Sequence, residues 1–258
     1  MRPLLIAAAA SLALTGAALA AAPASVTIPP YVARAMADPE RVGDKHNDAR
    51  RHAAEIVAFS GARPGAKVVD LIPGSGYFSK VFSKVVGPAG RVYAIWPDEY
   101  DRESHPDSDK LRQLAKQAGF RNIVVLTQPA KAFATPEPVD VVFTSQNYHD
   151  YPDPFMGRLD PMVFNRAVYR SLKPGGVFLV VDHIAQAGSG MRDTDTLHRI
   201  DPQTVKAQVT AAGFVYAGKL DVLRNSADNH RLKVFDPKVR GRTDQFVFKF
   251  VKPAGARR

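Results

Sequence analysis

Two histidine–aspartate pairs occur in the chain, each shortly after an apolar run that predicts a β-strand. His149 and Asp150 form the first pair, and Asp182 and His183 form the second. Histidine titrates near neutral pH and a carboxylate can orient its ring, so such pairs suit proton transfer. We therefore predict His149 as a general base, Asp182 as its orienting partner and His183 as a third catalytic residue. Capping and loop hydrogen bonds are the alternative explanation.

The residues around these pairs are predicted to contact a substrate. This set comprises Asn147, Tyr148, Asp150 and His198. Arg199, beside His198, can reach the same cleft, although both residues also suit packing at the start of the next helix. Two adjacent His–Asp pairs could bind a divalent metal, but their spacing is poor for that purpose, so no metal site is predicted.

A glycine turn follows the most regular apolar strand, at 68–72. Asp70 is the only charge in this strand, and Gly74 and Gly76 come just after it. Glycine permits positive φ angles and close backbone approach, and the amphipathic pattern that begins at Phe78 predicts a helix. Strand, glycine turn and helix form the geometry of a nucleotide site, although a simple βα turn has the same pattern.

Strands and helices alternate along most of the chain. Strands are predicted at 68–72, 92–96, 123–126, 139–144, 177–181, 215–223 and 246–251, and helices at 31–36, 48–59, 78–86, 110–118 and after the Asp-Pro pairs at 160–161 and 201–202. This alternation predicts an α/β fold, a three-layer sandwich with a mostly parallel sheet. The last two strands are joined by 224–243 without a helix, so they should pair antiparallel.

The N-terminus predicts export. Arg2 is followed by an alanine- and leucine-rich run without charge until Arg34, and Ala18-Leu19-Ala20 offers a small-residue cleavage site. We predict a signal peptide at 1–20, a helical extension at 21–60, the main domain at 61–253 and a basic tail at 254–258. An uncleaved membrane anchor is the alternative. A chain without cysteine can form no disulfide, which suits a bacterial periplasm.

Charge gives little information about partners. The net charge of +10 falls to +9 without Arg2, and most of the excess is spread along the chain. This pattern is typical of a solvated surface, so we expect no nucleic-acid partner and no stable membrane insertion after signal cleavage. The basic segment 224–243 is long enough to act as a mobile lid over the strand ends.

Taken together, these motifs resemble the class I S-adenosylmethionine-dependent methyltransferases. The likeness covers about 61–253 and rests on seven strands with an antiparallel last one, the pattern D-x-x-x-G-x-G at 70–76, and Leu-Lys-Pro-Gly-Gly at 172–176. The chain is more closely similar to exported bacterial proteins described as predicted methyltransferases. That likeness rests on 73–77, on Asn-Tyr-His-Asp at 147–150 and on His-Arg-Ile-Asp at 198–201. The resemblance implies a Rossmann-like methyltransferase fold.

S-Adenosylmethionine is the cofactor that this resemblance implies. The residues implied to bind it are Asp70, Gly74, Ser75, Gly76, Trp96, Pro129, Ala130 and Gln146. Three positions depart from the family pattern: Ile72 replaces a glycine, Trp96 replaces an acidic residue that binds the ribose, and Pro129 replaces an aspartate near adenine. Asp98 or Glu99 could supply the missing carboxylate, and Trp96 could instead stack on the cofactor.

The function expected from the sequence is methyl transfer from S-adenosylmethionine to a small-molecule substrate by an exported enzyme. The His–Asp pairs favour this hypothesis. The alternative is an exported binding protein or pseudoenzyme of the same fold with lost or altered cofactor binding, which the three departures favour. A hydrolase is disfavoured because the turn at 73–77 lacks the G-x-S-x-G pattern.

Overall fold

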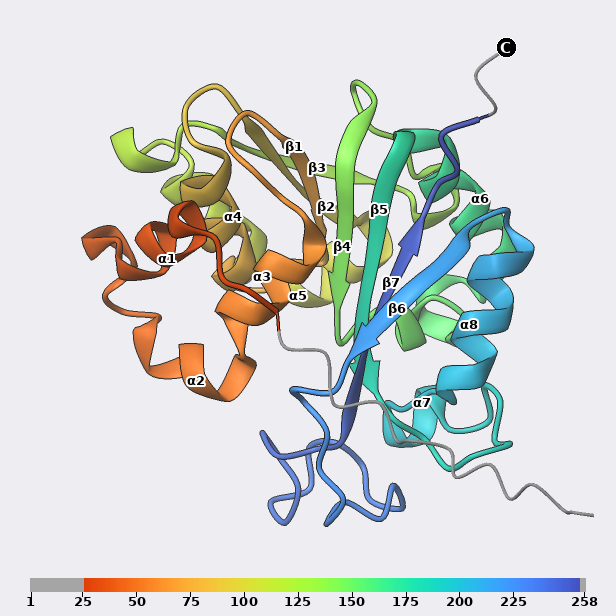
Figure 1. Ribbon diagram of the computed structural model, residues 1–258. Helices are drawn as coiled ribbons and strands as arrows, with labels where there is room; N and C mark the ends of the chain where they lie inside the picture. Colours follow the sequence, from red (N-terminus) through yellow and green to blue (C-terminus); the bar gives the residue numbers. More distant parts are fainter. Residues whose placement is uncertain (1–25, 256–258) are drawn as a thin grey trace, which may run out of the picture.

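The computed structural model describes residues 26–255, so the predicted signal peptide lies outside the described residues. A seven-stranded sheet forms its centre, with the order β3-β2-β1-β4-β5-β7-β6 (Figure 1). The strands are β1 (Lys67–Leu71), β2 (Arg91–Pro97), β3 (Ile123–Gln128), β4 (Val139–Ser145), β5 (Leu172–His183), β6 (Val215–Leu220) and β7 (Gln245–Val251). β7 pairs antiparallel with both β5 and β6, and the strand pairs from β3 to β5 are parallel. The predicted fold class is confirmed.

Helices cover both faces of the sheet (Figure 1). They are α1 (Pro30–Ala37), α2 (Asp48–Arg51), α3 (Ala53–Ser60), α4 (Tyr77–Val86), α5 (Asp98–Leu114), α6 (Pro161–Ser171), α7 (Thr194–Leu197) and α8 (Pro202–Ala211). α6 and α8 pack on one face and α1, α3 and α4 on the other. No helix within 26–255 is both long and apolar enough to span a membrane.

Side-chain alternation along the strands divides the core into two layers. In β5, Phe178 and Val180 pack with the α6 and α8 side, whereas Leu179 and Val181 pack with the α3 and α4 side. Successive residues of a strand point to opposite faces, so a continuous apolar run is what a doubly covered strand requires. The central strands were found from the sequence for this reason.

The starts of α6 and α8 follow the predicted capping pattern. The Asp160 side chain accepts a hydrogen bond from Met162 N at 2.8 Å, and Asp201 does the same for Gln203 N at 2.9 Å. A proline occupies the first helical position in both cases, where its missing N–H costs nothing.

Two predicted helix boundaries were wrong. The helix predicted at 48–59 is broken into α2 and α3 at His52, which adopts a left-handed φ of 45°. The helix predicted at 110–118 is α5, which begins much earlier, at Asp98. Most of its first half is charged or polar, so the sequence shows no apolar stripe there, but acidic residues suit the positive end of the helix dipole.

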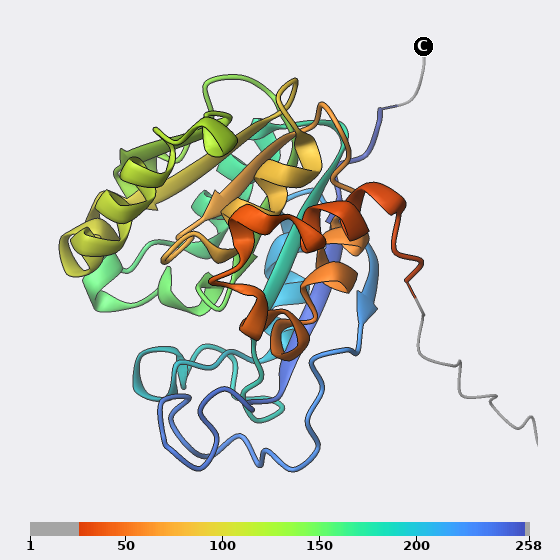
Figure 2. The same ribbon diagram turned by 90° about the vertical axis from the view of Figure 1, so that its left-hand side faces the viewer.

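The predicted N-terminal extension is part of the same layered structure. Val32 of α1 and Ile56 of α3 are buried in one cluster with Phe78 and Val81 of α4. The hydroxyl of Tyr77 also donates a hydrogen bond to Asp48 Oδ1 at 2.6 Å. Figure 2 shows α1 to α3 lying in front of the sheet. The extension therefore covers one face of the sheet.

Candidate functional site

A cavity of about 340 Å³ lies at the carboxyl ends of β4 and β5. Its walls are formed by Tyr100, Gln146, Asn147, His149, Asp150, Phe155, His183, His198, Val234 and Phe235. Ligands in open α/β sheets bind at this edge. A larger cavity of about 500 Å³ lies between α8 and β6, but it holds no comparable group of facing imidazoles. We therefore place the candidate site at the smaller cavity.

The predicted contact between His149 and Asp182 is confirmed. His149 lies on a short 3₁₀ turn (Tyr148–Asp150) after β4, and its Nδ1 is 2.8 Å from Asp182 Oδ1. Asp182 is fully buried, and its two carboxylate oxygens also accept hydrogen bonds from the backbone N–H groups of His149 and His183. A carboxylate held by three bonds fixes the orientation of the imidazole ring.

The other edge of the His149 ring faces a carboxylate and a second imidazole. Its Nε2 lies 3.1 Å from Asp150 Oδ1 and 3.3 Å from His198 Nδ1. Burial alone would lower the pKa of His149, but the charges of Asp182 and Asp150 outweigh it and raise this pKa well above its usual value. The ring therefore carries its proton at neutral pH and must release it before acting as the predicted general base.

His183 differs from His149 in its protonation. Burial lowers the pKa of His183 to about 3, so its ring is neutral. Its Nδ1 lies 2.8 Å from Thr243 Oγ1, and its ring also borders the cavity. A neutral imidazole beside a protonated one gives the cavity both a hydrogen-bond acceptor and a donor.

The residues predicted to contact a substrate divide into two groups. Asp150 and His198 line the cavity, and so does Asn147, whose Nδ2 donates to the Ile72 carbonyl at 3.0 Å. Tyr148 does not line it: this side chain is buried, and its hydroxyl bonds Asn165 Nδ2 at 2.7 Å and Gln208 Oε1 at 3.1 Å. The prediction for Tyr148 was wrong because successive side chains of a 3₁₀ turn point in directions about 120° apart, so Tyr148 enters the core while His149 faces the cavity.

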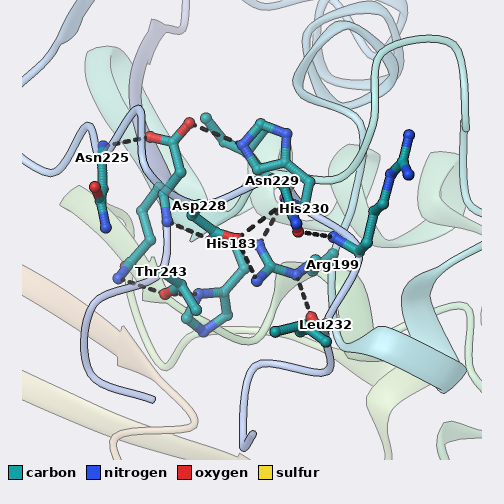
Figure 3. A network of polar contacts seen from close by, with 12 residues as sticks. His183, Arg199, Asn225, Asp228, Asn229, His230, Leu232 and Thr243 are labelled. Atoms are coloured by element: carbon teal, nitrogen blue, oxygen red, sulfur yellow. Dashed lines mark hydrogen bonds and ion pairs between the residues drawn. The ribbon is translucent and has the colours of Figure 1, made fainter. Parts of the chain in front are cut away.

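Arg199 also does not reach the cavity. Its guanidinium is fully buried and forms an ion pair with Asp228 at 2.9 Å. It donates two further hydrogen bonds, to the carbonyls of Ile184 and Leu232. Figure 3 shows this network, which ties the segment between β6 and β7 to the end of β5. Arg199 therefore has a structural role.

The segment 224–243, predicted as a mobile lid, is fastened at both ends. Arg224 and His230 bind the Asp244 carboxylate, and the Asp244 N–H donates to Asp228 Oδ2 at 2.8 Å. Between these anchors, Val234 and Phe235 extend to the cavity wall. The segment lies over the strand ends, as predicted, and its mobility stays a prediction.

The glycine turn after β1 has the predicted backbone. Gly74 and Gly76 have φ angles of 56° and 81°, and a Cβ at Gly74 would meet nothing within 4 Å. A Cβ at Gly76 would instead lie 2.5 Å from Leu111 Cδ1, so this glycine is required for close packing against α5. Ser75, between them, is exposed. The turn thus presents open backbone only around Gly74.

Ile72, which replaces a glycine of the family pattern, adopts a φ of 50°. This left-handed conformation is unfavourable for a β-branched residue and costs on the order of 1–3 kcal/mol. The Ile72 carbonyl is held by Asn147, as described above. The backbone at Ile72 thus has the left-handed conformation that glycine usually adopts, while the isoleucine side chain is buried beside it.

Asp70 lies beneath this turn, away from the cavity wall. Its side chain is 2% exposed, and its Oδ2 accepts a hydrogen bond from Ser79 Oγ at 2.6 Å. Burial raises the pKa of Asp70 to about 7 although Ser79 and Arg51 oppose the shift. A carboxyl group that is half protonated at neutral pH is a weak anchor for a cofactor unless binding changes its surroundings.

The predicted nucleoside side of the site is closed. Trp96 is fully buried, and its Nε1 has no hydrogen-bond partner among the described residues. Pro129 and Ala130 border a cavity of only about 10 Å³, together with the ring of Tyr151. Glu99, considered as a substitute carboxylate, accepts a hydrogen bond from Ala130 N at 2.9 Å. Trp96, predicted to bind the cofactor, instead packs into the core as a large apolar indole, and its contact with a ligand stays a prediction.

Four residues of the cavity wall were missed from the sequence: Tyr100, Phe155, Val234 and Phe235. Phe155 and Phe235 are large hydrophobic side chains that remain 38% and 54% exposed. In the sequence, Phe235 could have been recognised as an isolated aromatic residue within the basic segment 224–243. Gln146, predicted at the cofactor, does line the cavity, and its Nε2 donates to Gln245 Oε1 at 3.0 Å.

Comparison with known proteins places this chain in a family. The family model for protein-L-isoaspartate(D-aspartate) O-methyltransferase (PCMT) matches residues 31–162. The ubiquinone/menaquinone biosynthesis C-methyltransferase UbiE of Pasteurella multocida is 35% identical over 124 residues, which cover 48% of this chain and 42% of that one. A protein-L-isoaspartate O-methyltransferase of Ignicoccus hospitalis is 27% identical over 129 residues, covering 49% and 52%. The chain spans about half the length of these curated relatives.

Solved structures agree in fold. A S-adenosylmethionine-dependent methyltransferase from Aquifex aeolicus superimposes with a TM-score of 0.57 at 17% identity, covering 86% of this chain and 98% of that one. The chain therefore has the fold of the class I S-adenosylmethionine-dependent methyltransferases. It belongs to the PCMT family. S-Adenosylmethionine, the predicted cofactor, is supported by the same comparisons.

The residues fit this cofactor at one end only. Open backbone around Gly74 suits close approach of a ligand, and Gln146 lines the cavity. At the ends of β2 and β3, by contrast, Trp96 and Tyr151 leave no room for a nucleoside. The unpaired Trp96 Nε1 and Tyr151 hydroxyl are buried donors at this closed place. The nucleoside end therefore does not fit the structure as it stands.

Proposed function

We propose that this protein is an exported methyltransferase that acts on a small molecule held in the cavity at the ends of β4 and β5. One observation carries the proposal: the cavity of about 340 Å³ combines aromatic walls with the imidazoles of His149, His183 and His198. Small-molecule sites are concave, largely apolar and contain a few converging polar groups, with volumes of about 300–1,000 Å³. This cavity has each of those properties.

The roles of the side chains follow from their protonation and position. When bound, S-adenosylmethionine supplies an electrophilic methyl group on a sulfonium sulfur. The neutral ring of His183 can accept a hydrogen bond from a hydroxyl or amine of the methyl acceptor. His149, oriented by Asp182, can donate one from the neighbouring position, since the two ring centroids are 6.2 Å apart. Such positioning of the acceptor is the main contribution that a protein makes to a displacement reaction.

The relatives differ in the substrates that their names give. One is named for ubiquinone/menaquinone biosynthesis and another for L-isoaspartate in proteins. The cover formed by Val234 and Phe235 supports a small molecule, because a segment tied down at both ends limits the access of a protein chain. For this reason we propose a small molecule, and not a protein, as the methyl acceptor.

Transfer from labelled S-adenosylmethionine tests this choice. Purified protein, labelled cofactor and a bacterial extract should give label in the small-molecule fraction, and a His183→Ala variant should lose it. Label that appears in the protein fraction and survives filtration would contradict the small-molecule proposal. A His46→Ala variant, changed at an exposed position far along the chain from the site, is the control.

Export is supported by the charge-free alanine- and leucine-rich run and its Ala18-Leu19-Ala20 site. Cleavage after Ala20 should leave a periplasmic protein whose intact mass begins at Ala21. Recovery of the uncut chain only from membranes would contradict this part of the proposal and favour an anchor.

A second function has one observation in its favour. The closed space beside Pro129 and Tyr151 suits a binding protein or pseudoenzyme of this fold that has lost its cofactor. Calorimetry separates the two functions, because an enzyme must bind S-adenosylmethionine or its analogue sinefungin. Absence of binding by folded protein would select the pseudoenzyme.

A further inference from the structure

We propose that His149, Asp150 and His198 form a binding site for a first-row divalent transition-metal ion at the wall of the cavity. The three ligand atoms are His149 Nε2, Asp150 Oδ1 and His198 Nδ1. Two come from the turn after β4, and the third comes from the residue that follows α7. Adjacent pairs in the sequence are poorly spaced for a metal ion, and the fold supplies the missing third ligand.

The distances between the ligand atoms suit one ion. His149 Nε2 lies 3.1 Å from Asp150 Oδ1 and 3.3 Å from His198 Nδ1, and the last two atoms are 3.7 Å apart. Bonds of about 2.0–2.2 Å to a tetrahedral ion place its ligands about 3.3–3.5 Å from one another. A single ion can therefore lie at bonding distance from the three atoms after shifts of a few tenths of an ångström.

The surroundings of His149 are those of a metal-binding histidine. Its Nδ1 lies 2.8 Å from the fully buried Asp182 carboxylate, which identifies Nδ1 as a donor. An incoming metal ion would displace the proton of Nε2, and the lone pair left there would point at the other two ligands. Metal-binding histidines usually donate their second N–H to such a carboxylate, which fixes the tautomer and strengthens the ligand. Asp182 would be this outer partner.

A shared proton is the competing explanation for the same cluster. In that case the Nε2–H of His149 would donate to Asp150 and His198 at once. Charge-assisted hydrogen bonds of this kind are about 2.7–2.9 Å long, whereas the two contacts measure 3.1 and 3.3 Å. The contact with Asp150 is within the ordinary hydrogen-bond range of about 2.7–3.2 Å, whereas the contact with His198 lies just beyond it. One shared proton thus accounts for the first contact but not for the convergence of all three atoms, which a bound ion explains.

The site has an open position. All three ligand residues border the cavity of about 340 Å³, and His198 is the most exposed of them, with 23% of its side chain accessible. A site with three protein ligands and an open fourth position is typical of catalytic metals. Two imidazoles and one carboxylate suit Zn²⁺, Fe²⁺, Co²⁺ or Mn²⁺ rather than Ca²⁺. The open position would bind water or an oxygen donor of a molecule in the cavity.

Cobalt binding tests the inference directly, without S-adenosylmethionine or a methyl acceptor. Untagged mature protein is stripped with a chelator and titrated with Co²⁺, followed by visible absorption and calorimetry. We expect one ion per chain and a visible absorption band typical of nitrogen and oxygen ligation, displaced by Zn²⁺. Because no methyl transfer is measured, this outcome is independent of the proposed function.

Two variants and one matched control complete the test. His198→Ala should abolish the band, and Asp182→Asn should weaken binding by about 10–100-fold. His230→Ala is the control, because His230 also has 23% of its side chain accessible and also contacts a carboxylate, at 3.0 Å. Circular dichroism must show that each protein is folded.

Three results would overturn the inference. The first is the absence of a Co²⁺ band in the folded wild-type protein. The second is a band that persists unchanged in His198→Ala. The third is loss of the band in His230→Ala but not in His198→Ala, which would place the ion at Asp244 instead.

Discussion

The two halves of the sheet's carboxyl edge differ in whether the buried polar side chains named below have hydrogen-bond partners. At the ends of β4 and β5, Asp182 and His149 bind each other, and the cavity beside them is open. At the ends of β1 to β3, the Trp96 Nε1 and the Tyr151 hydroxyl have no partner among the described residues, and the space is about 10 Å³. Buried polar atoms are almost always hydrogen-bonded, so the unpaired ones need an explanation.

This difference teaches how the site is organised. In the open half, His149 and Asp182 are preorganised, because they are already held by hydrogen bonds and need not move to meet a ligand. The closed half retains donors that a bound nucleoside could satisfy, but only after Tyr151 moves. Binding of S-adenosylmethionine should therefore be coupled to a local rearrangement in the closed half.

The largest effect is expected when the open half is broken at Asp182. Replacement by alanine leaves the buried, protonated His149 without its nearest carboxylate, and such a loss costs about 3–5 kcal/mol. Urea unfolding measures it as a reduced midpoint. Asp195→Ala, at an exposed position, should change the free energy of unfolding by less than about 0.5 kcal/mol. Equal effects of both variants would show that the open half is not held by this pair.

Removing the charge of Asp70 should stabilise the closed half. The folded protein keeps the Asp70 proton up to about pH 7, whereas the unfolded chain releases it near 3.8, so stability falls as pH rises through this window. Above pH 7, ionisation of Asp70 in the folded protein reduces the free energy of unfolding by about 4 kcal/mol. An asparagine there leaves an amide unpaired at about 1–3 kcal/mol, so Asp70→Asn should gain about 2 kcal/mol at pH 8.

The pH dependence provides the check for Asp70. The advantage of Asp70→Asn in urea unfolding should shrink from pH 8 to pH 5, where wild-type Asp70 is protonated in the folded state. Asp140→Asn is the control: Lys173 and other partners outweigh burial and lower the pKa of Asp140, so this carboxylate is ionised in the folded and unfolded states throughout this range and its loss should destabilise equally at pH 5 and pH 8. A constant difference between pH 5 and pH 8 would contradict the raised pKa.

Two tyrosines allow a smaller and matched comparison of the halves. Tyr151→Phe removes a buried hydroxyl without a partner among the described residues, so it should stabilise by about 1 kcal/mol. Tyr148→Phe removes a hydroxyl bonded to Asn165 and Gln208, so it should destabilise by about 1–2 kcal/mol. If thermal unfolding shifts the melting temperature in the same direction for both variants, the proposed difference between the halves is wrong.

The smallest effect concerns the segment that covers the open half. The Asp244 amide is buried and bonded to Asp228 at 2.8 Å, whereas the Lys238 amide is exposed and bonded to Asp236. Native-state hydrogen exchange should be slower at Asp244 than at Lys238 in the free protein. If S-adenosylmethionine binding orders the segment, protection should rise near 233–240. Similar exchange rates for the Asp244 and Lys238 amides would contradict the idea that the ends of this segment are held more firmly than its centre.

Some of the site could be predicted because local rules decide it. The strands and the two Asp-Pro helix starts follow from side-chain periodicity and capping, which involve only neighbouring residues. The contact of His149 with Asp182 follows from one further rule, that adjacent parallel strands end at the same edge of the sheet. The family pattern predicted the fold in the same way, through its motifs at 70–76 and 172–176.

Tertiary structure decided the rest. Trp96 became a core residue because β2 is covered on both faces, and the identity of its neighbours depends on distant segments. Tyr148 and His149 are adjacent in sequence, yet one points into the core and the other to the cavity. His198 joins His149 across 49 positions of the chain. Sequence patterns determine which face of an element is buried, but which distant side chains converge depends on how the elements pack in three dimensions.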